Sequence, residues 1–328
     1  MKKILVLFGG NSTEHYVSCK SAKSILENID KKLFDVTSVG LDLNNEWYIY
    51  EDELEYLEEG DWIDKNVIKV ENIISFLKQF DVVFPVIHGN TGEDGKIIGL
   101  LELFNIKYVG CNLISSAIGF DKGFSKYVFN ELGIPQTKYL IIQNDINIKV
   151  IEKNLKYPMI IKPANGGSSI GISKANNKKE LINAIKIAQK YDKKIIVEEF
   201  IKARELEIAI LEDKKLIISD PGEILSGNEW YDYDAKYSNK DSKTIIANIP
   251  KNIKILIKEY AKKTFIGINA KGLARIDFFY KPDTDEIFIN EINTLPGFTT
   301  ISMYPKLMEN EKISYKNLIT KLINNSYY

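Results

Sequence analysis

The stretch RIDFFYKPDTDEIFINEINTLPG, residues 275–297, predicts two β-strands joined by a turn. Side chains alternate between the two faces of a strand. This period places Arg275 and Asp277 on one face of the first strand, and Glu291 and Asn293 on one face of the second. The hairpin therefore presents four polar groups on one side.

The register of the hairpin decides whether those groups meet. If the turn pairs Tyr280 with Phe288, Asp277 lies opposite Glu291, and the other two polar residues also face each other. The apolar neighbours then point to the opposite, core side: Ile276, Phe278 and Ile292.

Oxygen ligands of this kind suit Mg²⁺, which keeps several waters and is usually completed by nucleotide phosphates. The alternative is an ordinary hairpin with a solvated polar face. The Pro296-Gly297 turn directly after the polar residues argues against that alternative, because an exposed strand face does not explain it.

The composition is that of an ordinary globular protein, and the length predicts two or three packed subdomains. The chain has 328 residues, of which 45% are hydrophobic and 27% charged, and its net charge is -1. Near-neutrality argues against nucleic acid or a membrane surface as the main partner. Two cysteines far apart, Cys19 and Cys111, and two histidines, His15 and His88, imply neither a disulfide framework nor a zinc site.

The amino-terminal apolar run is too short for the hydrophobic region of a signal peptide. It also ends in Gly9-Gly10 and not in a cleavage site. No stretch approaches the roughly 18 apolar residues that span a bilayer. We therefore expect a soluble, cytoplasmic protein.

The first third of the sequence predicts an α/β unit. Strands are expected at 3–8, 34–41 and 81–87, with helices at 17–29 and 95–104. This alternation predicts a parallel sheet with crossover helices. The acidic residues 51–64 are expected to form a surface excursion.

From Asp121 onwards the pattern is α+β. The expected helices are 122–132, 178–191, 252–266 and one from Ser314, and the expected strands are 157–163, 194–199 and 205–211. There is no internal repeat.

Lys162 ends a strand and is followed by a glycine-rich loop that closes at Gly171. Such a loop can bring backbone donors and an ammonium to a phosphate. It is not a Walker loop, because the lysine precedes the glycines. A plain hairpin turn remains the alternative for this loop alone.

Two other strand ends carry acids. Glu198 and Glu199 face opposite sides of a strand, and one of them can reach an adenine amine while Ile201 packs on the ring. Exposed strand-end acids are the alternative. Glu14 opens the first helix. It is either an acid that the helix dipole favours at this end or the partner of a substrate ammonium. His88 lies on the same sheet edge, where α/β sheets collect ligands, although a structural role suits it better.

Together these residues resemble a known family. The motifs that carry the resemblance are Gly9-Gly10-x-Ser12-x-Glu14, His88-Gly89-x-x-Gly92-Glu93-Asp94-Gly95, Asp121-Lys122, Lys162-Pro163, Gly167-Ser168-Ser169-x-Gly171, Tyr231-Asp232-Tyr233-x-x-Lys236-Tyr237, Arg275-x-Asp277 and Asn290-Glu291-x-Asn293-Thr294-x-Pro296-Gly297. In this order they are similar to the D-alanine:D-alanine ligase family of the ATP-grasp superfamily, over nearly the whole chain.

The resemblance implies a three-subdomain ATP-grasp architecture of α/β and α+β type. Residues 1–121 would form an N-terminal Rossmann-like substrate domain with a parallel sheet. Residues 122–201 would form a small ATP-grasp subdomain, and 202–328 a C-terminal one with the metal site and a lid loop.

The resemblance also implies residue roles. Catalysis would fall on Glu14, Ser168, Tyr237, Arg275 and Ser302. ATP would be bound by Lys122, Lys162, Ser169, Glu198, Glu199, Ile201, Glu205 and Lys236. Substrate would contact Glu14, His88, Arg275, Gly297, Ser302 and Met303. Asp277, Glu291 and Asn293 would hold two Mg²⁺ ions, for which Mn²⁺ can substitute.

The implied reaction is ATP-dependent joining of two D-alanines through an acyl phosphate, for peptidoglycan precursor synthesis, by a cytoplasmic homodimer. Met303 and the Lys236-Tyr237 pair favour D-alanine as the second substrate over D-serine or D-lactate. Three residues depart from the family pattern, namely His15, Tyr16 and Ile301.

Other functions are also compatible with parts of the sequence. A D-alanine:D-serine ligase or another ATP-grasp carboxylate-amine ligase is the nearest. A catalytically silent nucleotide-binding or regulatory protein is a further alternative. The intact polar residues of the hairpin argue against it: Arg275, Asp277, Glu291 and Asn293. A Rossmann dehydrogenase would need the fingerprint G-x-G-x-x-G, which is absent.

Overall fold

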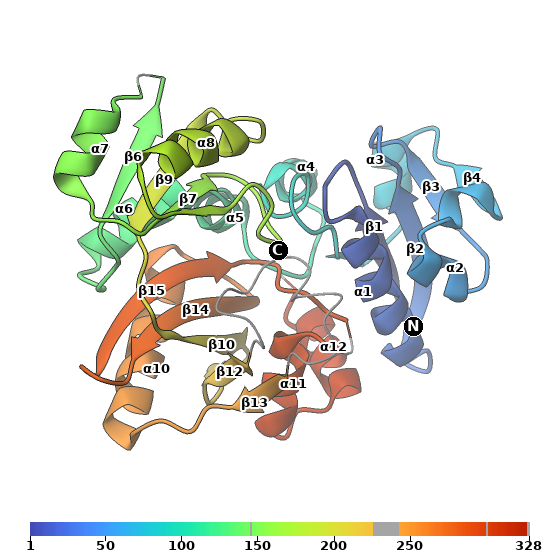
Figure 1. Cartoon of the computed structure of the whole chain (residues 1–328). Helices are drawn as coiled ribbons and strands as arrows, with labels where there is room; N and C mark the ends of the chain where they lie inside the picture. Colours follow the sequence, from blue (N-terminus) through green and yellow to red (C-terminus); the bar gives the residue numbers. More distant parts are fainter. Residues whose placement is uncertain (145, 226–242, 300, 327–328) are drawn as a thin grey trace.

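The structure is a computed structural model, which describes residues 1–144, 146–225, 243–299 and 301–326. Three β-sheets follow one another along the chain, and Figure 1 shows helices packed on each. They are built from residues 2–85, 139–199 and 204–293. Each sheet thus lies inside one of the three predicted ranges, whose boundaries stay predictions.

The first sheet has the strand order β4-β3-β2-β1-β5. Its parallel part consists of β1 (Lys2–Gly9), β2 (Phe34–Leu41) and β5 (Val82–Pro85). Helix α1 (His15–Asn28) connects β1 to β2. The predicted parallel sheet is therefore confirmed for these three strands.

The same sheet is extended by an antiparallel edge, which the sequence analysis did not predict. Strands β3 (Trp47–Tyr50) and β4 (Val67–Lys69) pair antiparallel with β2 and with each other. The five residues between β2 and β3 are too few for a crossover, which needs a dozen or more, so the chain reverses.

Residues 51–64 are more than a surface excursion, so that expectation is wrong in part. They contain helix α2 (Glu55–Glu59) and the short 3-10 helix Trp62–Asp64. Trp62 is buried over the sheet, and a Cβ on Gly40 would lie 2.4 Å from its ring. Trp62 and Leu57 of this acidic segment therefore complete a core.

Helices α3 (Ile73–Leu77) and α4 (Lys96–Leu103) flank β5 in the sequence. The two following helices are α5 (Leu113–Phe120) and α6 (Lys122–Glu131). Both contact the third sheet at β15 (Glu286–Asn293), and Phe129 of α6 is buried in the core of that sheet.

The second sheet is antiparallel, in the order β6-β9-β7-β8. Its strands are β6 (Tyr139–Gln143), β7 (Met159–Pro163), β8 (Ser173–Ala175) and β9 (Lys194–Glu199). Helices α7 (Ile148–Asn154) and α8 (Lys178–Ala188) cover it, and the apolar face of α8 packs on β7.

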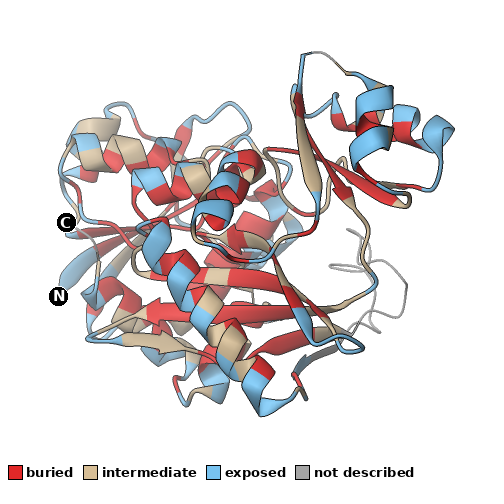
Figure 2. Cartoon of the chain, turned by 90° about the vertical axis from the view of Figure 1, so that its left-hand side faces the viewer, coloured by how far each residue is buried: buried red, intermediate tan, exposed pale blue. Residues whose placement is uncertain are grey.

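The third sheet is also antiparallel, with the path β13-β12-β10-β14-β15. Its strands are β10 (Arg204–Glu212), β11 (Leu216–Ile218), β12 (Gly222–Leu225), β13 (Lys243–Ile246), β14 (Leu273–Lys281) and β15. Helix α10 (Lys251–Gly267) buries Ile253, Ile257 and Ala261, at helical spacing, in the same core. Figure 2 shows this division between buried strands and exposed outer helix faces.

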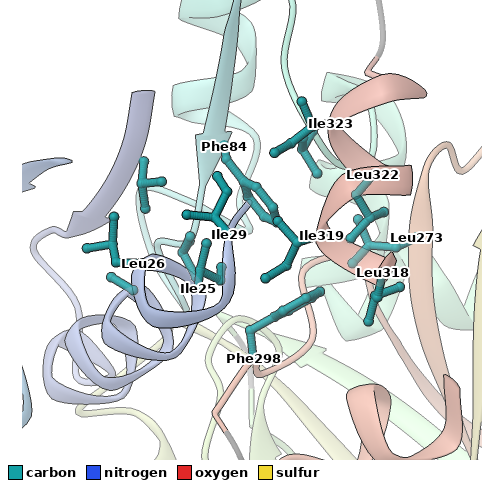
Figure 3. Packing of buried hydrophobic residues seen from close by; sticks show 14 of the residues in the cluster. Ile25, Leu26, Ile29, Phe84, Leu273, Phe298, Leu318, Ile319, Leu322 and Ile323 are labelled. Atoms are coloured by element: carbon teal, nitrogen blue, oxygen red, sulfur yellow. The ribbon is translucent and has the colours of Figure 1, made fainter. Parts of the chain in front are cut away.

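The first and third parts of the chain share one hydrophobic core, which Figure 3 shows. Ile25 of α1, Ile29 directly after this helix and Phe84 of β5 pack towards Ile319 of α12 (Tyr315–Asn324) and towards Phe298. Helix α11 (Met303–Asn310) adds to the same core. This packing holds the ends of β1 and β5 beside the loop that follows β15.

Among the described residues, no helix combines the length and apolar character needed to cross a membrane.

Candidate active site

A cavity of about 300 Å³ lies where the three sheets meet. It brings together most of the predicted site residues from all three parts of the chain: Glu14, His88, Lys122, Lys162, Ser168, Ser169, Glu198, Glu199, Ile201, Glu205, Arg275, Glu291, Asn293, Gly297, Ser302 and Met303. Asp277 does not line it. The predicted Lys236 and Tyr237 lie outside the described residues.

The polar hairpin is β14 and β15, and its register confirms one expectation and corrects another. Asp277 lies opposite Glu291, as predicted. Tyr280, however, pairs with Ile287 and not with Phe288, because a bulge shifts the register by one residue between Asp277 and Phe278. The bulge adds a residue on β15 and so keeps the two carboxylates opposite each other.

Arg275 is the best-connected cation of the cavity. Its Nε and Nη2 atoms donate to the two carboxylate oxygens of Asp277 at 2.8 and 2.7 Å, and Nε lies 3.0 Å from Glu207 Oε2. Burial opposes its charge, but Asp277 and Glu207 outweigh burial and raise the pKa of Arg275 well above its ordinary value. The guanidinium is therefore charged and fixed in place.

Glu207 is a further site residue, which the sequence motifs do not include. It lies on β10 directly opposite Asp277, so that Glu207, Asp277 and Glu291 form a row across three adjacent strands. The signal that could have found it is the strand period, because Glu207 is two residues after the predicted Glu205.

The predicted metal ligands are close to one another. Asn293 Nδ2 donates to Asp277 Oδ2 at 3.0 Å, and Glu291 lies across the hairpin. In the described part of the chain no three His, Cys, Asp or Glu side chains form a metal cluster. Two carboxylates and one amide nevertheless fit a hard cation that takes its remaining ligands from water and phosphate.

Glu198 is buried between two lysines. Its Oε2 lies 2.9 Å from Lys162 Nζ, and its Oε1 pairs with Lys126 Nζ. Burial opposes ionisation, but the charges of Lys126 and Lys162 dominate and lower the pKa of Glu198 to about 2. The carboxylate thus binds lysines, whereas the sequence analysis proposed an adenine amine as its partner. Glu199, by contrast, accepts a hydrogen bond from Lys156 N at 3.0 Å.

Lys126 was also missed. It lies one helical turn after Lys122 on α6, and this spacing on one helix face was the available signal. Lys122 itself donates to Gly166 O at 2.8 Å and lies 3.5 Å from Glu291 Oε2. The glycine-rich loop, the hairpin and α6 therefore meet at Lys122.

We expect the Glu198 ion pairs to stabilise the fold above pH 4.5, the ordinary pKa of this carboxyl, and to lose that contribution as the pH falls towards 2. The difference in unfolding free energy between the protein and Glu198→Gln should be on the order of 3 kcal/mol at neutral pH and should narrow below pH 4.5. Urea denaturation across this pH range measures it.

The exposed Glu309→Gln is the matched control and should show no such narrowing. If the difference in unfolding free energy between the protein and Glu198→Gln stays constant down to pH 3, the lowered pKa of Glu198 is refuted.

Glu14 and Ser168 form the opposite end of the cavity. Ser168 Oγ donates to Glu14 Oε1 at 2.5 Å, which joins α1 to the glycine-rich loop. Gly167 permits this approach, because a Cβ there would lie 2.1 Å from Glu14 Oε2. Ser168 and Ser169 both have positive φ, 50° and 60°, so the loop holds a strained conformation here.

His88 is buried, and both its ring nitrogens have partners. Nε2 lies 2.9 Å from Ser21 Oγ, and Nδ1 lies 3.3 Å from Leu295 O and 3.6 Å from Glu93 Oε1. These bonds tie β5 to the loop after β15, which is the structural role that the sequence suggested.

Ser302 precedes α11 and lies against the loop after β15. Its Oγ accepts a hydrogen bond from Thr299 N at 3.0 Å. A Cβ on Gly297 would lie 2.9 Å from Ser302 Oγ, so glycine keeps this corner open. Met303 is buried beside it, and Ile301 is 60% exposed at the rim.

Similarity to known proteins extends over nearly the whole chain. The family described as D-ala D-ala ligase N-terminus matches residues 3–111, and D-ala D-ala ligase C-terminus matches 128–324. The D-alanine--D-alanine ligase of Acetivibrio thermocellus is 44% identical over 98% of this chain and 95% of its own length. That of Clostridium novyi is 43% identical, with coverages of 98% and 97%.

Solved structures of D-alanine ligases are also similar to this chain over nearly its whole length. The VanG D-Ala:D-Ser ligase from Enterococcus faecalis superposes with a TM-score of 0.89 and 38% identity, over 98% of both chains. The D-alanine-D-alanine ligase from Coxiella burnetii gives a TM-score of 0.84 and 30% identity, over 99% of this chain and 93% of that one.

Proposed function

The chain belongs to the D-alanine–D-alanine ligase family of ATP-dependent ligases, and we propose that it joins two D-alanines into D-alanyl-D-alanine for peptidoglycan precursor synthesis. ATP activates the carboxylate of the first D-alanine as an acyl phosphate. The amine of the second D-alanine attacks this carbonyl, and ADP and phosphate leave.

The observation that carries the proposal is the single cavity in which three kinds of group converge. Lys122 and Lys162 supply cations to its lining and Glu291 supplies a carboxylate, which Asp277 faces across the hairpin. Glu14 lies at the far end of the cavity. A nucleotide and two small amino acids need these three environments at once.

The nucleotide is held by residues around the second sheet and the hairpin. Lys122, Lys162 and Ser169 bind phosphates together with Lys236, while Glu198, Glu199, Ile201 and Glu205 line the base and ribose pocket. Asp277, Glu291 and Asn293 hold Mg²⁺, as two ions, with Mn²⁺ as a substitute. The metal neutralises phosphate charge, which is the main demand of phosphoryl transfer.

The amino acid substrates occupy the other end of the cavity. Glu14, held by Ser168, accepts the ammonium of the first D-alanine, and His88 supports this region. Tyr237, which lies outside the described residues, is assigned to the same group by the family resemblance alone. Arg275 and the Gly297 N–H stabilise the oxyanion that forms when the second amine attacks. Ser302 binds the carboxylate of the second D-alanine, beside Met303.

ADP release in the presence of D-alanine, D-serine, D-lactate and their L-isomers tests the proposal. We expect D-alanine to support the fastest turnover and to yield the dipeptide. Turnover with none of these acids, under conditions where ATP binds, would contradict the assignment.

A D-alanine:D-serine ligase is the second candidate, because the VanG D-Ala:D-Ser ligase superposes over nearly the whole chain. Met303 decides between them. It is buried at the start of α11, and its thioether offers no strong polar partner for a hydroxyl. An unpaired buried hydroxyl costs roughly 1–3 kcal/mol, so D-alanine should be preferred about 5- to 150-fold.

Met303→Arg is therefore expected to move the preference towards D-serine. Competition assays with equal D-alanine and D-serine measure the product ratio. Met303→Leu, which keeps the apolar volume, should leave the ratio unchanged. Predominant D-alanyl-D-serine from the unmodified protein would favour the second candidate.

We further place the protein in the cytoplasm as a homodimer that binds neither nucleic acid nor membrane. Sedimentation at the 37.5 kDa mass of one chain would contradict the dimer.

A further inference from the structure

Lys126 is a charged residue that the proposed reaction does not use. It is 1% exposed on α6, and its ammonium lies 4.6 Å from the ring centre of Tyr139. Burying an ammonium costs several kcal/mol unless it is paired, so its retention needs a reason. Its partner is Glu198 Oε1.

Glu198 in turn connects Lys126 to the cavity. Its second oxygen lies 2.9 Å from Lys162 Nζ, which also donates to Asn290 Oδ1 at 3.4 Å. Lys162 and Glu198 line the cavity, whereas Lys126 does not. The ion pair with Glu198 is therefore the contact by which Lys126 can act on a ligand in the cavity.

The charge balance of this cluster indicates what that effect is. One carboxylate is shared by two ammonium groups, so the buried cluster of Lys126, Glu198 and Lys162 carries an excess positive charge. Without Lys126, Glu198 and Lys162 would form a neutral pair, and the carboxylate would bind Lys162 more tightly. An ammonium whose charge is balanced by its own carboxylate attracts phosphate less.

We propose that Lys126 is a positioning residue for nucleotide binding. It pairs with one oxygen of Glu198 and so leaves the charge of Lys162 only partly balanced, and Lys162 then meets the nucleotide phosphates in the cavity. This inference rests on the proposed function, because it takes ATP as the ligand of Lys162.

The test measures ATP binding apart from turnover. Titration calorimetry with ATP and Mg²⁺, without D-alanine, gives the Kd, and steady-state assays give kcat and the KM of each substrate. The variants are Lys126→Met, the double variant Lys126→Met with Glu198→Gln, and the exposed control Lys186→Met.

Lys126→Met should raise the Kd and KM for ATP about tenfold or more, the scale on which a group that orients a binding residue acts, and should leave the KM for D-alanine nearly unchanged. The double variant should bind ATP more tightly than Lys126→Met, because Lys162 no longer has a competing carboxylate, but less tightly than the unmodified protein, because Glu198 also lines the cavity. Lys186→Met should match the unmodified protein.

An unchanged Kd in Lys126→Met would overturn the proposal, as would a double variant that binds ATP no better than the single one. A purely structural role would lower thermal stability and affect both substrates alike. If Lys126→Met does not fold, Lys126→Gln, which keeps a polar group beside Glu198 but removes the charge, takes its place and should raise the Kd for ATP in the same way. An unmodified protein that fails to bind ATP would refute the proposed function instead.

Discussion

Glu291→Gln is expected to lower ligase activity by about 10³-fold or more while leaving the fold intact. Glu291 lies opposite Asp277 on the hairpin and 3.5 Å from Lys122. Glutamine keeps the size of the side chain but removes the negative charge that would bind Mg²⁺ and balance the lysine. ATP should then bind poorly in the presence of Mg²⁺.

ADP release and calorimetric ATP binding measure this effect, and circular dichroism checks the fold. Glu286→Gln is a matched control on the same hairpin, because Glu286 makes only surface contacts with Lys281 and Thr284. Normal turnover in Glu291→Gln would refute the assignment of the hairpin as the metal site.

Arg275→Lys is expected to lower kcat by about 10²-fold or more, with smaller changes in KM. The guanidinium contacts Asp277 through two nitrogens and also reaches Glu207. An ammonium cannot make this fork, so it would leave a buried carboxylate less well paired and would not point the same donors at an oxyanion.

The composition supports this expectation. Of 44 basic residues only two are arginines, Arg204 and Arg275, and both form forked pairs with a carboxylate. Arg204 pairs with Glu223 and does not line the cavity. Arg204→Lys is therefore the control, which should lose stability with little change in kcat. An unchanged kcat in Arg275→Lys would show that Arg275 is only structural.

Local patterns in the sequence were sufficient for most of the secondary structure. The predicted strand 34–41 coincides with β2 and the strand 194–199 with β9, because apolar alternation and flanking turn residues act over a few neighbours. The same period placed Asp277 and Glu291 on the same face of the hairpin, where they lie opposite each other. It did not reveal the bulge, since one extra residue on β15 only becomes visible when both strands are paired.

Partners far apart in the sequence could not be read from it. For Glu198 and Glu199 the sequence suggested an adenine amine or solvent, and it gave no sign that the packing of α6 places Lys126 and Lys162 on the two oxygens of Glu198. Glu207 acquired its importance only when β10 paired with β14 and brought it to Arg275. Such ion pairs follow from three-dimensional proximity, which no local period encodes.

The sequence by itself determined the elements, the polar face of the hairpin and the family resemblance. Only the tertiary structure decided that the cavity forms at all. Phe84, Phe298 and Ile319 come from segments up to 235 positions apart, and their packing in one core holds Glu14 beside Ser168 and the hairpin. The physical reason is that hydrophobic burial is non-directional, so the sequence specifies which side chains are buried but not which of them meet.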